Sequence, residues 1–160
     1  MTVAPRVGLG YDIHRLAAGR RLVLGGVAIE HPTGLVGHSD GDVLLHAVMD
    51  AILGAAGLGD LGSHFPSDDP RYKDADSREL LRRIGSEVRE AGYSIVSLDA
   101  TIVAQAPRLD SHVAAMKSAI ARGLQLPLES VSLKAKTSDG IGAIGAGEAI
   151  AAIAVALATK

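Results

Sequence analysis

The residues of this chain best suited to chemistry are histidines and aspartates, which gather in two stretches. In the first, one residue separates Asp12 from His14 at the end of a segment with strand character. Residues two apart in a strand project to one side, so both side chains are expected together while Ile13 points into the core. Taken alone, the pair equally fits a turn aspartate beside a solvated histidine. A metal site therefore needs a further ligand from elsewhere in the chain.

The second stretch supplies that ligand on a predicted helix. Asp42, His46 and Asp50 are four residues apart and share one stripe of an otherwise apolar segment. Burying three polar groups is unfavourable unless each has a partner. A core histidine satisfied by neighbouring carboxylates is one interpretation, but it leaves Asp12 and His14 unexplained. The other makes Asp12, His14 and His46 the ligands of a divalent metal, as at catalytic zinc sites, with Asp42 or Asp50 orienting a ligating imidazole.

Three further segments have the composition of loops that contact a substrate, although each alone also fits a plain surface loop. The first, residues 60–69, contains Asp60, Leu61, Gly62, Phe65, Pro66, Ser67, Asp68 and Asp69. The second follows a predicted strand and consists of Ala104, Gln105, Ala106, Pro107 and Arg108. The third ends another predicted strand and includes Lys136, Thr137, Ser138 and Asp139.

Two other features have a chemical and a structural interpretation. His38 lies beside Ser39 just before the helix that offers His46, so it is expected to donate a hydrogen bond to a substrate oxygen. An ordinary loop histidine is the alternative. The glycine-rich residues 142–147 superficially suggest a phosphate loop. No Gly-Lys-Ser/Thr sequence follows them, so a structural turn is the better interpretation.

The elements that must position these residues follow from hydrophobic periodicity and from glycine and proline. Strands are predicted at 6–14 and 21–29, paired with each other, and at 94–104, 131–137 and 149–158. Helices are predicted at 42–56, starting from Ser39 or Asp40, at 77–91 behind a capping box, and at 109–124. Residues 60–74 are expected to form a loop. This order predicts an α+β fold, a mixed α/β sandwich with a four-stranded type of sheet backed by helices.

Composition narrows the class of protein. A chain of 160 residues, 48% hydrophobic, is expected to form a single domain over 1–160. Only 2% of residues are aromatic, so an aliphatic core would gain from further burial in an oligomer. The 16 basic residues are scattered among 18 acidic ones, which disfavours nucleic-acid or anionic-membrane binding. There is no cysteine, so histidine and carboxylate must hold any metal. The N-terminus lacks a signal-peptide core, and a cytoplasmic location is expected.

Taken together, the ordered motifs resemble the 2-C-methyl-D-erythritol 2,4-cyclodiphosphate synthase family from about Arg6 to Lys160. The motifs are Gly-Tyr-Asp-Ile-His at 10–14, His-Ser-Asp-Gly-Asp at 38–42 with His46, Leu-Gly-Asp-Leu-Gly at 58–62, Phe-Pro at 65–66, Asp-Ser-Arg at 76–78 and Ala-Gln-Ala-Pro at 104–107. The resemblance implies a homotrimer with active sites between adjacent subunits, in the non-mevalonate route to isoprenoid precursors. It also implies conversion of 4-diphosphocytidyl-2-C-methyl-D-erythritol 2-phosphate into the cyclic diphosphate with release of CMP, a phosphorus–oxygen lyase reaction.

The resemblance also implies residue roles at matching positions. It makes Asp12, His14 and His46 zinc ligands, and it makes His38 and Thr137 the residues that stabilise the transition state. It gives Ser39, Asp60 and Gly62 to the methylerythritol part, and residues 104–108 with Lys136 and Thr137 to the cytidine-diphosphate pocket. The rest of the 60–69 loop, Ser138 and Ala143 are further candidate substrate contacts. Asp139 stands where the family usually has glutamate, and there it would hold magnesium or manganese with the substrate diphosphate. The family often has arginine where this chain has Ala146, so no phosphate contact is expected from that position.

The implied reaction needs no strong base, because the attacking phosphate is already anionic near neutral pH and CMP leaves as a stable anion. The obstacle is charge repulsion, about 4 kcal/mol for two like charges roughly 4 Å apart at an effective dielectric near 20. Divalent cations neutralise such charge and align the displacement. Two other functions fit parts of the pattern. One is a zinc-dependent phosphodiesterase that yields a linear product, and the other is a non-catalytic trimeric nucleotide-binding module.

Overall fold

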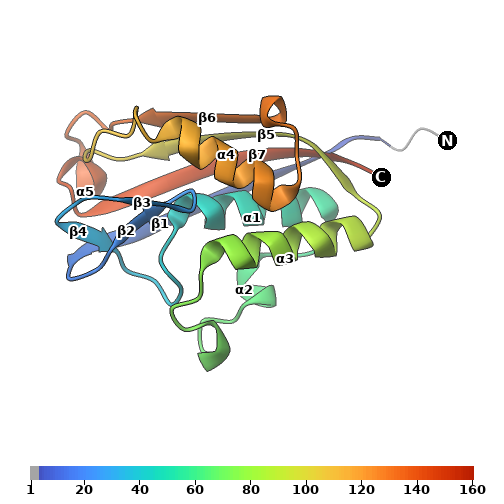
Figure 1. Ribbon diagram of the computed structural model, residues 1–160, viewed down its shortest axis with the longest axis horizontal. Helices are drawn as coiled ribbons and strands as arrows, with labels where there is room; N and C mark the ends of the chain where they lie inside the picture. Colours follow the sequence, from blue (N-terminus) through green and yellow to red (C-terminus); the bar gives the residue numbers. More distant parts are fainter. Residues whose placement is uncertain (1–3) are drawn as a thin grey trace.

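A mixed sheet with helices on one face carries the predicted ligands. The computed structural model describes residues 4–160, with α1, α3 and α4 on the same side of the long strands (Figure 1). In chain order the elements are β1 (Arg6–Ala18), β2 (Leu22–Leu24), β3 (Val27–Ile29), β4 (Thr33–Leu35), α1 (Val43–Ala56), α2 (Leu61–His64), the 3-10 helix η1 (Pro70–Tyr72), α3 (Ser77–Glu90), β5 (Ser94–Val103), α4 (Val113–Leu124), the 3-10 helix η2 (Leu128–Ser130), β6 (Val131–Lys136), α5 (Gly142–Gly145) and β7 (Ala149–Thr159).

The main sheet has five strands in the order β4-β1-β7-β5-β6. The β5–β6 pair is parallel, and every other neighbouring pair is antiparallel. The mixed α/β prediction is confirmed. Its four long strands form the predicted type of sheet, and the three-residue β4 adds a short strand at one edge.

The predicted pairing of residues 6–14 with 21–29 is wrong. Residues 22–29 form a separate two-stranded hairpin, in which Leu24 pairs with Val27 across a two-residue turn. Gly25 and Gly26 occupy this turn with φ of 58° and 74°, the positive values that tight hairpins require. The segment therefore closes on itself, and β1 pairs with β7 instead.

Helix α1 lies over β1 and β7 and is buried along nearly its whole length. It begins after Asp42, whose side chain caps it by accepting from the backbone N–H of Leu45. The predicted start at Ser39 or Asp40 is therefore too early. Asp40 instead folds residues 40–42 into a turn, since its side chain accepts from the Asp42 N–H at 3.1 Å. Gly57, in the left-handed conformation, ends the helix as the sequence predicts.

The two faces of β1 meet different surroundings. Gly10 faces α1, and a Cβ built on it would lie 1.8 Å from the carbonyl oxygen of Ala47, so only glycine permits this approach. Asp12 and His14 follow Gly10 at two-residue spacing and share its side of the strand. Ile13 faces away and is 43% exposed, which corrects the expectation that it points into the core. The reason is that β1 turns its glycines, rather than its large residues, toward the helix.

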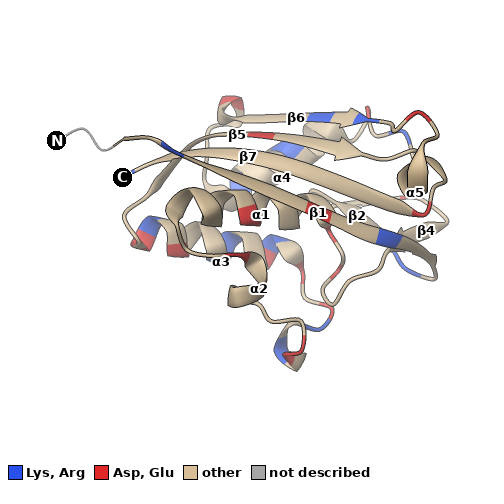
Figure 2. Ribbon diagram, turned by 180° about the vertical axis from the view of Figure 1, so that it is seen from behind, with Lys and Arg blue, Asp and Glu red and all other residues tan. Residues whose placement is uncertain are grey.

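Along β1 and β7, the opposite sheet face is largely apolar and is uncovered in the single chain. Strand β7 contains no charged residue, and in Figure 2 it runs uncoloured across this face. The exposed hydrophobic side chains on β1 and β7 are Val7, Leu9, Tyr11, Ile13, Ile153 and Val155. An exposed apolar surface of this kind marks a site of association.

The remaining elements stay close to their predicted limits. Asp76 caps α3, and β5, β6 and β7 follow the predicted strands within two residues. Helix α4 begins at Val113, later than predicted, and the 60–74 loop contains the short helices α2 and η1. Across residues 4–160, none of the helices has the length and apolar character needed to cross a bilayer.

Candidate active site

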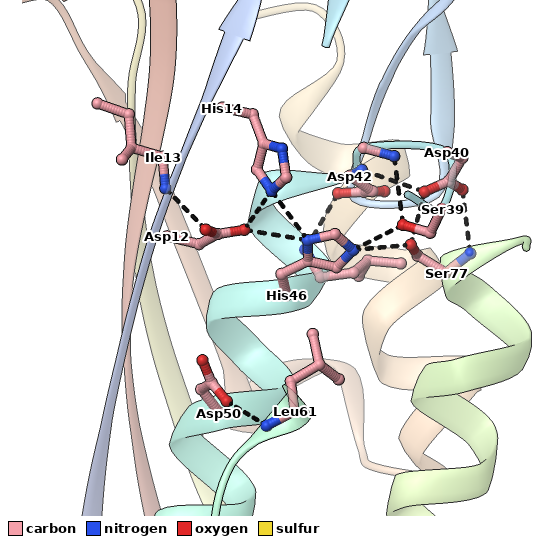
Figure 3. A network of polar contacts seen from close by, with 12 residues as sticks. Asp12, Ile13, His14, Ser39, Asp40, Asp42, His46, Asp50, Leu61 and Ser77 are labelled. Carbon is pink, nitrogen blue, oxygen red and sulfur yellow. Dashed lines mark hydrogen bonds and ion pairs between the residues drawn. The ribbon is translucent and has the colours of Figure 1, made fainter. Parts of the chain in front are cut away.

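The three predicted metal ligands converge where β1 crosses α1, and Figure 3 shows their side chains pointing toward one another. One carboxylate oxygen of Asp12 lies 2.8 Å from Nε2 of His14 and 3.0 Å from Nδ1 of His46. The two imidazole nitrogens are 3.3 Å apart. All three ligand atoms fall within 4.8 Å of one another. One carboxylate and two imidazoles at this spacing form a set of donors that fits a divalent cation.

The charges of the cluster are strongly coupled. Burial acts to raise the pKa of Asp12, but hydrogen bonds from His14 and His46 outweigh it and hold that pKa well below its ordinary range. The hydrogen bond to Asp12 raises the pKa of His14, against the opposing effect of burial. The cluster thus places a carboxylate beside two imidazole nitrogens, and a bound cation would contact all three.

Each imidazole is held from behind by a second contact. The Nδ1–H of His14 donates to the backbone carbonyl of Val36, which leaves Nε2 facing the cluster. Nε2 of His46 lies 3.0 Å from the hydroxyl of Ser39 and 3.2 Å from that of Ser77. The Val36 carbonyl and the two serine hydroxyls therefore contact the imidazoles in the orienting role that was predicted for Asp42 or Asp50.

Asp42 and Asp50 instead bind backbone amides. Asp42 is fully buried and accepts from the N–H groups of Gly25, Gly26 and Leu45 at 2.7–3.0 Å. Its burial raises its pKa to about 6, with these N–H groups opposing the shift. Asp50 accepts from the Leu61 N–H at 2.7 Å. Asp42 therefore fixes the start of α1 against the 25–26 turn, because the three N–H groups need an acceptor there. Asp50 ties the middle of α1 to the start of α2.

A pocket of about 640 Å³ opens directly onto the cluster. It is lined by Asp12, His14, His38, Ser39, His46, Asp50, Leu61, Gly62, Phe65, Pro66, Ser67, Asp68, Tyr72 and Leu80. The pocket thus unites both ligand stretches with most of the predicted 60–69 loop. It is large enough for a drug-sized or nucleotide-sized ligand.

His38 enters this pocket with one nitrogen already engaged. Its Nε2 lies 2.9 Å from the backbone carbonyl oxygen of Asp69, so the neutral ring carries its proton there. Nδ1 then faces the surroundings as an acceptor. Donation to a substrate oxygen, the role expected from the sequence, requires a protonated ring or release of the Asp69 carbonyl.

A second, smaller pocket of about 130 Å³ lies at the ends of β5 and β6. It is lined by Ala104, Gln105, Pro107, Arg108, Leu109, Asp110, Ala135, Lys136 and Thr137. Its lining shares no residue with that of the large pocket. The structure therefore groups the predicted residues into two sets on one chain and does not bring the sets together.

Several predicted residues line neither pocket. Asp60 is exposed and caps α2, where Ser63 hydrogen bonds lower its pKa. Asp69 caps η1 and pairs with Arg71 at 2.6 Å. The other predicted substrate-binding residues outside both linings are Ala106, Ser138, Asp139 and Ala143. Among them, Asp139 is exposed and contacts Thr137 Oγ1 at 3.2 Å.

Sequence reasoning missed three participants. Ser77 was assigned only to a helix start, yet its hydroxyl also reaches His46. Tyr72 lines the large pocket, and its position beside Phe65 in an aromatic-poor chain was the available signal. The Val36 carbonyl left no signal, because a backbone acceptor is independent of residue type.

Known proteins match this chain over nearly its whole length. Residues 5–159 match the YgbB family. The 2-C-methyl-D-erythritol 2,4-cyclodiphosphate synthase of Bordetella avium is 55% identical over 160 residues, covering 100% of this chain and 99% of its own. A solved 2C-methyl-D-erythritol-2,4-cyclodiphosphate synthase in a CDP-bound form superposes with a TM-score of 0.87 at 38% identity, over 96% of this chain and 99% of its own. The bifunctional IspDF from Campylobacter jejuni gives 0.94 at 41% identity; the match spans 98% of this chain but only 42% of that longer one.

The fold and the site define a mixed α/β protein with an Asp–His–His site for a divalent metal at the mouth of a substrate-sized pocket. The chain belongs to the YgbB family, whose curated members related to it are named 2-C-methyl-D-erythritol 2,4-cyclodiphosphate synthase. The family resemblance stated from the sequence motifs is confirmed.

Proposed function

We propose that this chain is a 2-C-methyl-D-erythritol 2,4-cyclodiphosphate synthase that works as one domain. It would convert 4-diphosphocytidyl-2-C-methyl-D-erythritol 2-phosphate into the cyclic diphosphate and release CMP, as a phosphorus–oxygen lyase of cytoplasmic isoprenoid precursor synthesis. The observation that carries the proposal is the convergence of Asp12, His14 and His46 at the large pocket, in a chain that matches such synthases end to end.

The reaction is an intramolecular displacement at phosphorus. An oxygen of the substrate's 2-phosphate forms a bond to the diphosphate phosphorus that is attached to the methylerythritol. The bond from that phosphorus to the bridging oxygen, which stays with CMP, breaks. CMP takes the electron pair and leaves as an anion, so no protein nucleophile is needed. Holding the two phosphates in line adds to the rate, since intramolecular attack gains from orientation.

The large pocket would hold the reacting end of the substrate. A zinc ion on Asp12, His14 and His46 would neutralise phosphate oxygens there. Ser39 and the 60–69 loop would bind the methylerythritol part. His38, when protonated, would place positive charge and a donor beside the phosphates, and Thr137 would add a neutral hydroxyl donor from the small pocket.

The small pocket would hold the leaving end. Residues 104–108 would read the cytidine through backbone groups, with Lys136, Ser138 and Ala143 beside its phosphates. Lys136 is exposed and enters no ion pair in residues 4–160, so its charge is available to a phosphate. Asp139 would hold magnesium or manganese together with the substrate diphosphate.

We further propose that a homotrimer builds the complete site, with the large pocket of one subunit facing the small pocket of the next. Two features support this arrangement. The two linings are separate on one chain, and the uncovered sheet face carries exposed side chains such as Leu9 and Ile153. Burying roughly 800 Å² of such a face per subunit is typical of a stable interface.

The test is incubation of the zinc-loaded, magnesium-supplemented protein with the cytidylylated substrate. CMP is measured by chromatography, and the other product by phosphorus NMR. We expect equal amounts of CMP and a cyclic diphosphate with two coupled ring phosphorus signals. A linear product would identify a hydrolase, and CDP binding without CMP release would identify a non-catalytic nucleotide-binding module.

A further inference from the structure

The strongest unexplained contact in the site is the one between His46 and Ser77. Ser77 is 0% exposed, does not line the large pocket, and yet places its hydroxyl 3.2 Å from Nε2 of a ligating histidine. On its other side the same hydroxyl lies 2.5 Å from a carboxylate oxygen of Asp40. We propose that Asp40 and Ser77 are positioning residues that fix the tautomer of His46 so that Nδ1 faces the metal.

The proton positions follow from what each group can do. A carboxylate only accepts, so the hydroxyl proton of Ser77 is donated to Asp40. The hydroxyl oxygen of Ser77 then has only lone pairs left for His46, and Nε2 must carry the proton between them. In a neutral imidazole the other nitrogen, Nδ1, is then unprotonated. Nδ1 is the atom that lies 3.0 Å from Asp12, inside the ligand cluster.

Further hydrogen bonds fix the relay that runs from Asp40 through Ser77 to His46. The other oxygen of Asp40 accepts from the backbone N–H of Ser77 at 3.0 Å, so one carboxylate grips both the amide and the hydroxyl. Asp40 also accepts from the Asp42 N–H just before α1. The relay therefore ties the start of α3 to the start of α1, the helix that carries the ligand. Ligand orientation by such partners commonly changes metal affinity ten- to a hundredfold.

Ser39 also contacts His46 Nε2, but its position differs. Its hydroxyl lines the large pocket and is not bound to a carboxylate in the described residues. With the proton on Nε2, the Ser39 hydroxyl can only accept from His46, at 3.0 Å, so its own proton remains available for donation to a substrate. The buried serine thus orients the ligand, and the pocket serine serves the substrate. This inference rests on the metal site of the proposed function but not on its reaction.

The experiment measures metal affinity directly, so a failed synthase assay leaves it interpretable. Apo protein is titrated with zinc against a competing chelator, and with cobalt while its visible spectrum is recorded. We expect Ser77→Ala to weaken zinc binding about ten- to a hundredfold and to shift the cobalt bands. At saturating zinc its turnover should recover. Ser86→Ala, on the same helix and away from the site, is the control and should match the unmodified protein.

Two more variants complete the test. Asp40→Asn, which leaves Ser77 in place but can donate to it, should weaken zinc binding in the same direction, and it decides the matter if Ser77→Ala does not fold. Ser39→Ala should raise the KM for substrate while zinc affinity changes less than about threefold. Wild-type zinc affinity and an unchanged cobalt spectrum in folded Ser77→Ala or Asp40→Asn protein would overturn the proposal.

Discussion

A single chain forms more of the large pocket than of the small one. In the large pocket, Asp12, His14 and His46 contact one another, and each histidine has a second partner behind it. In the small pocket, Lys136 and Thr137 are exposed at the end of β6. Both hydrogen bonds of the Thr137 hydroxyl are made with Asp139, two residues further along the chain.

The difference teaches which steps depend on association. A metal site whose ligands are pre-positioned within one chain needs no partner to bind its ion. The small pocket, of about 130 Å³, is too small to enclose a cytidine diphosphate, so in the proposed trimer its remaining walls would come from the neighbouring subunit. Metal binding and turnover should therefore separate experimentally.

Removing a ligand is the most severe way to test the large pocket. We expect His46→Ala to abolish both zinc retention and CMP release, because two remaining donors do not hold the ion. Metal analysis of the purified variant and the CMP assay measure the two effects. Normal turnover by a zinc-free variant would refute the ligand assignment.

Disrupting the uncovered sheet face should separate the two pockets. Leu9 is 68% exposed in the single chain, and Leu9→Glu would bury a charge in the proposed interface. We expect a monomer by light scattering, with turnover reduced at least about a hundredfold and zinc still bound. A monomeric variant with full activity would mean that one chain holds the whole site.

Mixing inactive subunits sharpens the same point. His46→Ala damages only the large pocket and Thr137→Ala only the small one. If each site takes one pocket from each of two neighbours, co-expressed trimers should regain about one quarter of full activity, since two independent halves must both be intact. Activity no higher than that of either variant alone would place both pockets of each site in one subunit.

The proposed second ion gives a smaller effect. We expect Asp139→Ala to raise the magnesium or manganese concentration needed for half-maximal turnover about tenfold, while zinc content stays the same. Titration of each metal in the CMP assay measures the shift. Loss of zinc instead would contradict the assignment of Asp139 to the second ion.

The smallest effect concerns stability rather than turnover. Burial raises the pKa of Asp42 from 3.8 to about 6, so the folded chain holds a proton that the unfolded chain releases between about pH 4 and 6. This contribution to stability is full below pH 4 and is lost as the pH rises through 6. It amounts to about 3 kcal/mol at most. Asp42→Asn should remove that slope in urea unfolding between pH 4 and 7; an identical slope would contradict it.

The sequence predicted what local patterns determine. Alternation identified β7, a capping residue identified α3, and a two-residue spacing placed Asp12 beside His14. It failed where long-range packing decides. The face of β1 turned toward α1 depends on how closely two backbones approach, so Ile13 was assigned to the wrong side.

The site shows the same division. The candidate ligands followed from residue type, because few residue types bind a divalent metal. The partners of those ligands did not, since the Val36 carbonyl and the Ser77 hydroxyl reach the imidazoles from segments distant in sequence. The aspartates that seemed suited to that work, Asp42 and Asp50, are taken by backbone amides that no periodicity reveals.

The missing side chain at position 10 has one more effect. Since Gly10 lets β1 approach within contact of Ala47, it sets how far apart the strand and helix stand where they offer their donors. Adding a single methyl group there, two residues before Asp12, would push the two elements apart and enlarge the cage. The separation of the candidate ligands on β1 and α1 thus depends on a residue that contacts none of them.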